Sequence, residues 1–174
     1  MRIYRRLEAL SSPPCPRAVA LGNFDGLHLG HRRILGCLVE HAKRRGLVSL
    51  LLTFSPHPEK ILGRGRVLMI QPLSRRLEEA QALGLEEVLV MPFSADFSAL
   101  PPSRFIENVL VKALGARAVF VGSNFHFGRH RAGNVQTLEE YSRRTGRFEV
   151  CIVPPVVKSG RVVSSSLIRR FLLD

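Results

Sequence analysis

The fold is decided by the stretch Arg17-Ala18-Val19-Ala20-Leu21-Gly22-Asn23-Phe24-Asp25-Gly26-Leu27-His28-Leu29-Gly30-His31. Its first five residues are mostly apolar and predict a buried strand, whereas residues 32–45 repeat apolar side chains at the spacing of one helix face. The residues between them therefore turn from a strand into a helix. A helix N-terminus offers unpaired N–H groups and a partial positive charge, which suit a phosphate group. Glycines let the backbone approach such a ligand, and His28 and His31 add donors whose charge responds to it.

Apolar runs and helical patterns alternate along the rest of the chain. We expect strands over residues 19–21, 48–54, 88–91, 118–121 and 149–153, and helices over residues 32–45, 74–83, 102–114 and 134–145. The third of these helices begins near Pro102, or Ser103 is instead the cap that precedes it. Nearly continuous hydrophobicity in strands that alternate with helices is typical of a parallel sheet covered on both faces. The sequence therefore predicts an α/β fold, a Rossmann-like doubly wound parallel sheet of about five strands.

Three polar loops follow strands of this predicted sheet, at residues 22–31, 53–58 and 121–125. Ligands of open parallel sheets bind beyond the carboxyl ends of the strands, near the point where the strand order reverses. We therefore expect the three loops to converge on one crevice.

Length and composition fit one domain with a real hydrophobic core. The chain has 174 residues, of which 45% are hydrophobic, and no apolar stretch approaches the roughly 20 residues that span a bilayer. The basic N-terminus lacks the apolar segment of a signal peptide. Cys15, Cys37 and Cys151 are odd in number and widely spaced, which favours reduced thiols in the cytoplasm over disulfides or a zinc site. We expect a cytoplasmic protein that has no membrane segment.

The net charge of +12 raises the question of nucleic-acid binding. The basic residues, however, are spread along the chain as pairs, most of them on predicted polar helix faces: Arg5-Arg6, Arg32-Arg33, Arg44-Arg45, Arg75-Arg76, Arg143-Arg144 and Arg169-Arg170. Such pairs are typical of a solvated surface, and the chain has two tyrosines and no tryptophan for stacking on bases. We expect no nucleic-acid partner, since a small polyanionic substrate accounts for some of the charge.

Three further motifs follow the histidine turn, and each also has a purely structural interpretation. The prolines of Thr53-Phe54-Ser55-Pro56-His57-Pro58 make a stiff loop that borders the site, or alternatively a purely structural rigid turn with a histidine on the surface. Residues 122–128, Gly-Ser-Asn-Phe-His-Phe-Gly, followed by Arg131-Ala132-Gly133-Asn134, line a site or close the edge of the core. The hydroxyls of Ser164-Ser165-Ser166, before Arg169, bind phosphate or cap the final helix. Residues 93–100 pack as a plain loop or, as the resemblance described next implies, shape an acceptor pocket.

Taken in order, the four motifs resemble those of the HxGH nucleotidyltransferase superfamily and, within it, of the prokaryotic FAD synthetases. The resemblance covers residues 17–170. It implies in-line attack of the FMN phosphate on the α-phosphorus of ATP, giving FAD and diphosphate, with Mg²⁺ accompanying ATP. The substrates would be ATP and FMN. The sequence indicates neither metal ligands nor an oligomeric state.

The resemblance also assigns roles to individual residues of this chain. The catalytic residues would be His28, His31 and Arg169. The ATP-binding residues would be Gly22, Asn23, Phe24, Asp25, His28, Gly30, His31, Ser164, Ser165, Ser166 and Arg169. The flavin-binding residues would be Asn23, Pro56, His57, Pro58, Asn124, Phe125 and Phe127. Asn23 and Asp25 would order the loop or the nucleotide.

The chain departs from the family's pattern in two respects. Asn124 and Asn134 stand where many members carry aspartate, so hydrogen bonding is kept while a negative charge is lost. Many members also continue into a riboflavin kinase domain, whereas we expect residues 1–174 to form a single nucleotidyltransferase domain without that kinase domain.

Other functions remain open from the residues alone. The same histidine turn serves adenylyl- or cytidylyltransferases with other acceptors, and the lost carboxylates fit a non-catalytic module that binds flavin or nucleotide. A zinc site at the two histidines is disfavoured because the sequence places no further Cys, His or carboxylate ligand beside them.

Overall fold

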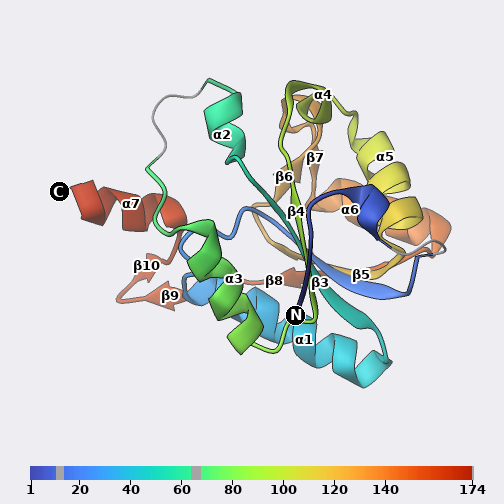
Figure 1. Cartoon of the computed structure of the whole chain (residues 1–174), viewed down its shortest axis with the longest axis horizontal. Helices are drawn as coiled ribbons and strands as arrows, with labels where there is room; N and C mark the ends of the chain where they lie inside the picture. Colours follow the sequence, from blue (N-terminus) through green and yellow to red (C-terminus); the bar gives the residue numbers. More distant parts are fainter. Residues whose placement is uncertain (11–13, 64–67, 174) are drawn as a thin grey trace.

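A six-stranded parallel sheet forms the centre of the structure, a computed structural model that describes residues 1–10, 14–63 and 68–173. Asp174, the last residue of the expected domain, therefore lies outside the described residues. The strands lie in the order β1–β4–β3–β2–β5–β8 (Figure 1). Their bounds are Arg2–Tyr4 for β1, Arg17–Leu21 for β2, Val48–Phe54 for β3, Glu87–Met91 for β4, Ala116–Gly122 for β5 and Glu149–Val153 for β8.

Helices cover both faces of this sheet, which confirms the doubly wound prediction (Figure 1). Alternate residues of β2 point to opposite layers. Val19 and Leu21 pack in the core that holds the π-helix η2 (Phe105–Ala113) and helix α6 (Val135–Thr145). Ala18 and Ala20 pack in the core that holds α1 (Leu29–Arg45) and α3 (Leu73–Ala82).

Some boundaries differ from the prediction for identifiable reasons. Helix α1 begins three residues earlier than expected, because the His28 ring Nδ1 accepts a hydrogen bond from the His31 backbone N–H at 3.4 Å and caps the helix. The helix expected over residues 102–114 is divided into the short α5 (Pro102–Arg104) and η2. The sheet has six strands rather than about five, since β1 adds an edge strand of three residues that are exposed or half-buried.

Most of the paired arginines are exposed, as predicted, but Arg76 is buried and Arg169 is half-buried. Arg17, at the start of the predicted first strand, is also buried. Its Nε donates to the Glu87 carboxylate at 2.7 Å, and its guanidinium also donates to the Leu114 carbonyl at 3.1 Å. A buried charge needs such partners, and this pair holds β2 to β4.

The switch in strand order positions the site. From the central strand β2 the chain builds β3 and β4 on one side, then crosses to build β5 and β8 on the other. The carboxyl ends of β2 and β5 are therefore neighbours at which the connections diverge, the place where such sheets bind ligands. Within the described ranges no helix is long and apolar enough to cross a membrane.

Short elements surround the carboxyl ends of the strands (Figure 1). Helix α2 spans Pro58–Ile61 and α4 spans Ala95–Ser98, while the turn η1 spans Leu7–Ala9. Two hairpins pair β6 (His126–Phe127) with β7 (Gly133–Asn134), around the turn η3 (Arg129–Arg131), and β9 (Val157–Lys158) with β10 (Arg161–Val162). The last helix, α7, spans Ser165–Leu173.

Candidate active site

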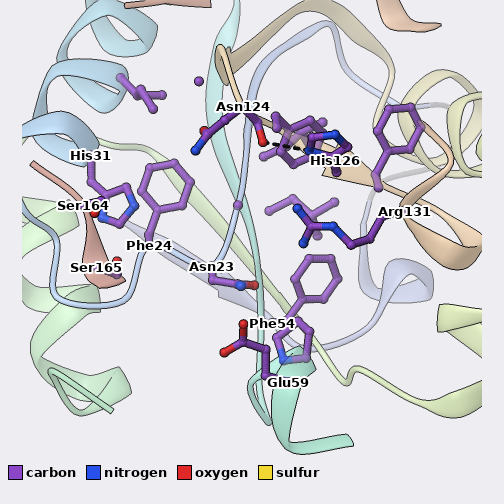
Figure 2. Close-up of a pocket in the computed structure, with 18 of the residues that line it drawn as sticks. Asn23, Phe24, His31, Phe54, Glu59, Asn124, His126, Arg131, Ser164 and Ser165 are labelled. Carbon is purple, nitrogen blue, oxygen red and sulfur yellow. Dashed lines mark hydrogen bonds between the residues drawn. The ribbon is translucent and has the colours of Figure 1, made fainter. Parts of the chain in front are cut away.

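A cleft of about 760 Å³ opens at the carboxyl ends of β2 and β5 (Figure 2). The loops after β2, β3 and β5 all line it, so the three polar loops converge as expected, and the segment before α7 adds a further wall. The predicted site residues that line it are Gly22, Asn23, Phe24, His28, Gly30, His31, Pro58, Asn124, Phe125, Phe127, Ser164, Ser165 and Ser166.

A smaller cavity of about 200 Å³ also borders the loop after β2, since Asn23, Phe24 and His31 line both spaces. Asp25, His57 and Arg169 line this smaller cavity and not the large cleft. Pro56 is exposed and, among the residues the structure describes, belongs to neither lining. The predicted residues thus fall into two adjoining spaces rather than one.

The two histidines lie against each other at the start of α1. Their rings stack with centroids 3.6 Å apart, and the His31 ring also lies 4.8 Å from the ring of Phe24. Burial lowers the pKa of His28, although Asp25 raises it in part. Burial, His28 and Arg76 together lower the pKa of His31 to about 3. Both rings are therefore neutral near pH 7, and a phosphate group would meet hydrogen-bond donors rather than a fixed imidazolium.

Asp25 orders the loop after β2 rather than facing the large cleft. It is 1% exposed, and its carboxylate accepts hydrogen bonds from the backbone N–H groups of Ile70 and Gln71 at 3.1 and 3.3 Å. Arg169 donates to the same carboxylate at 2.7 Å and to the Leu68 carbonyl at 2.9 Å. Of the two roles expected for Asp25, ordering of the loop is the one this geometry displays.

The three serines at the start of α7 make different contacts. The Ser164 hydroxyl accepts a hydrogen bond from the Leu167 N–H at 3.2 Å, so the capping interpretation holds for this residue. The Ser165 hydroxyl donates to the Asp25 carbonyl at 2.9 Å and joins α7 to the loop after β2. Ser166 is exposed. Figure 2 places Ser164 and Ser165 at the same end of the cleft as His31.

The other end of the cleft is aromatic. The rings of Phe54, Phe93 and Phe97 contact one another with centroids 5.4–5.8 Å apart, and those of Phe125 and Phe127 stack at 5.6 Å. The segment 93–100 therefore lines the cleft, and it contains the short helix α4 rather than packing as a plain loop. Such a wall suits a large planar apolar ring.

The two unusual asparagines have different settings. Asn124 is exposed in the cleft wall, and its backbone carbonyl lies 2.9 Å from the His126 Nδ1. Asn134 caps α6: its side-chain oxygen accepts from the Thr137 N–H at 3.0 Å in a capping box. Because asparagine caps as well as aspartate does, the substitution at position 134 preserves the start of this helix.

Several polar residues of the two spaces were missed from the sequence. Glu59 borders both, and His126 and Arg131 line the aromatic end of the cleft, where Figure 2 shows the Arg131 side chain extending inward. Arg76 lies buried behind the loop after β2. His126 and Arg131 could have been predicted, because one lies in the motif of residues 122–128 and the other begins the segment that follows it. Arg76 could not, because the pair Arg75-Arg76 gives no indication that only one of the two arginines is buried.

A parallel sheet with a histidine pair at a helix N-terminus, in a cleft at its switch point, defines an α/β protein of the nucleotidyltransferase class. The sequence profile described as FAD synthetase matches residues 11–167. The chain belongs to the FAD synthetase family.

Proteins similar to this chain agree with that assignment. The bifunctional riboflavin kinase/FMN adenylyltransferase of Listeria monocytogenes is 36% identical over 91% of this chain and 50% of its own length. The protein so named from Escherichia coli is 31% identical over the whole chain and 56% of its own length. A Streptococcus pneumoniae crystal structure, described as a macrolide-efflux protein, superposes with a TM-score of 0.86 at 27% identity, covering 99% of this chain and 57% of that one. The chain spans about half the length of the curated relatives it matches.

Proposed function

We propose that the protein is an FMN adenylyltransferase. A phosphate oxygen of FMN attacks the α-phosphorus of ATP, a new P–O bond forms, and the bond to the β-phosphate oxygen breaks, yielding FAD and diphosphate. The observation that carries this proposal is one cleft with the stacked His28–His31 pair at a helix N-terminus at one end and an aromatic wall at the other.

The donor end has groups suited to a triphosphate. The first-turn N–H groups of α1, together with His28 and His31, would stabilise charge that develops at the α-phosphate, which is the main demand of phosphoryl-type transfer. Gly30 keeps the first turn of α1 open, because a side chain there would meet the His28 ring at 3.1 Å. Ser164, Ser165 and Arg169 would hold the outer phosphates, for which Arg169 would exchange part of its pairing with Asp25.

The acceptor end has groups suited to a flavin. Phe125, Phe127 and Asn124 would face the isoalloxazine ring. The guanidinium of Arg131 would donate hydrogen bonds to the carbonyl oxygens of that ring. Asn23 lies between the two ends in Figure 2 and would contact either substrate. His57 and Pro58 would support the acceptor side from the start of α2.

Mg²⁺ would enter with the substrate. The described residues include no group of three or more His, Cys, Asp or Glu side chains placed to hold a metal ion. The side chains of the two cavities therefore fit a Mg²⁺ ion that arrives bound to the phosphates of ATP better than one that the protein holds permanently. The reaction would take place in the cytoplasm, where Cys15, Cys37 and Cys151 stay reduced.

The experiment is to incubate the purified chain with ATP, FMN and Mg²⁺ and to separate the products by chromatography. We expect FAD and diphosphate in equal amounts. Replacing ATP by CTP, or FMN by phosphopantetheine, tests transferases with other substrates. A folded protein that binds FMN tightly and releases no diphosphate would instead be a non-catalytic binding module.

A further inference from the structure

Arg76 occupies a place that its sequence neighbours conceal. Arg75, on the same helix α3, is exposed and pairs with Glu78 at 3.0 Å on the surface. Arg76 points the other way and is 6% exposed, behind the loop that follows β2. Burying a guanidinium costs free energy unless it is hydrogen-bonded or paired with an opposite charge, so the contacts of Arg76 indicate its role.

The contact of Arg76 is with the backbone of the candidate site. Its Nη1 donates to the carbonyl oxygen of Asn23 at 2.6 Å. The hydroxyl of Thr53, at the end of β3, donates to the same oxygen at 3.0 Å. One carbonyl thus accepts from two elements that lie far apart in the sequence, and the peptide between Asn23 and Phe24 is fixed in orientation.

That peptide leads into strained backbone. Phe24 has φ of 51°, in the left-handed region that a bulky residue rarely adopts, and Leu27 has φ of 35°. A residue in this conformation persists only where its surroundings hold it. The hydrogen bonds to the Asn23 carbonyl on one side and to the Asp25 carboxylate on the other supply that hold.

The strained turn places the groups that face the cleft. With the peptide fixed, the Phe24 ring packs 4.8 Å from the His31 ring, and the Asn23 side chain lies at the cleft (Figure 2). We propose that Arg76 is a positioning residue for adenylyl transfer, which clamps the Asn23–Phe24 peptide so that the His28–His31 pair is held ready for the nucleotide. This inference rests on the proposed function.

The positive charge of Arg76 also acts on the His31 ring. It lowers the pKa of His31, together with burial and His28, and burial in turn lowers the pKa of Arg76 itself. His28 and Arg76 act electrostatically on His31, and the other titratable or charged side chains that line the smaller cavity with His31 are Asp25, His57, Glu59 and Arg169. Removal of the Arg76 charge should therefore let His31 accept a proton at higher pH.

The test compares Arg76→Met with Arg75→Met, a matched change one residue away on the exposed face. We expect R76M to lower kcat/KM for ATP by about tenfold to hundredfold, the effect of misplacing reacting groups by a fraction of an ångström to 1 Å. R75M should stay within about twofold, since exposed ion pairs contribute little. The acid limb of the pH profile should move to higher pH in R76M alone.

A second measurement does not depend on catalysis. In the unliganded protein, NMR titration of the His31 ring should give a higher midpoint in R76M, as expected for loss of a nearby like charge, and an unchanged midpoint in R75M. If wild-type protein forms no FAD, the proposed function fails, while this titration still tests whether Arg76 acts on His31. R76M with wild-type kcat/KM and a wild-type His31 midpoint would overturn the inference, as would a lowered Tm without either change.

Arg76→Lys covers the case in which R76M does not fold. The ammonium keeps the charge but lacks the guanidinium's geometry, so we expect an unchanged His31 midpoint with kcat/KM for ATP lowered about tenfold. Wild-type activity in R76K would show that the clamp is not needed and would overturn the proposal.

Discussion

The rings of His28 and His31 stack at the first turn of α1 with their centroids 3.6 Å apart, and the His28 ring also caps that helix. Two imidazolium ions at this separation would repel each other strongly, so at most one of the two rings is protonated to imidazolium at a time. The same two residues therefore define the helix start, limit the charge of the site and present donors to the cleft.

His28→Asn separates the cap from the ring chemistry. Asparagine is a strong N-cap, so H28N should keep the stability of the wild type, whereas H28A should lose about 1 kcal/mol. Both should lower the rate of FAD formation by about a hundredfold to a thousandfold, the effect of removing one transition-state donor. Denaturant unfolding and steady-state kinetics measure the two effects. Full activity in the double variant H28A/H31A would contradict the assignment.

His31→Gln should change how stability depends on pH. The folded-state pKa of His31 is about 3 and its ordinary value is 6.5, so between these values the unfolded chain binds a proton that the folded protein does not. Wild-type stability should therefore fall as pH drops below about 6.5, by up to about 1.4 kcal/mol per pH unit for this one group. H31Q should show a shallower fall from pH 6.5 to 4 in unfolding titrations. Parallel curves for the two proteins would count against the buried neutral ring.

Arg131→Gly should exchange substrate affinity for stability. Arg131 has φ of 58°, where glycine carries no steric penalty, so R131G should be as stable as the wild type or about 1 kcal/mol more stable. Loss of the guanidinium from the acceptor end should raise KM for FMN about tenfold and leave KM for ATP nearly unchanged.

Ser159→Gly is the matched control for that change. Ser159 has φ of 50° in the turn between β9 and β10 and lines neither cavity among the residues described. S159G should relieve similar strain without altering either KM. An unchanged KM for FMN in R131G would remove Arg131 from the acceptor site.

Asp25 and Arg169 should be energetically coupled. The Asp25 side chain of this ion pair is 1% exposed and the Arg169 side chain is 18% exposed. Removing either partner would therefore leave the other charge largely buried without its counter-ion. In a cycle of D25N, R169M and the double variant, we expect a coupling energy of about 1–3 kcal/mol in unfolding experiments. If Arg169 also holds phosphate, R169M should raise KM for ATP more than D25N does. A coupling near zero would mean that the pair does not anchor α7.

The sheet could be predicted from the sequence because buried parallel strands such as Val48–Phe54 are mostly apolar and stand out from the helices between them. The edge strand Arg2–Tyr4 could not, since it has only three residues and its side chains are exposed or half-buried. The π-helical hydrogen bonding of Phe105–Ala113 was also hidden, because it differs from an α-helix in backbone geometry and not in composition.

The candidate site was predictable where one loop carries several functional side chains, as from Gly22 to His31. It was less so where a single residue enters from a distant element. Arg76 belongs to a helix whose pattern places arginines on a polar face, and its partner is a backbone carbonyl, which leaves no mark in the sequence. Glu59 reaches both cavities from the first turn of the short helix α2, which His57 caps.

The contact between Asp25 and Arg169 joins residues that are 144 positions apart. Ser165, which donates to the Asp25 carbonyl, is 140 positions away from it. A ribosome that makes this chain from its N-terminus therefore supplies the histidine loop long before the residues that fasten it. The sheet can begin to assemble beforehand, but the end of the cleft that we propose for ATP is completed only when α7 emerges, so growing chains should not bind ATP at an incomplete site.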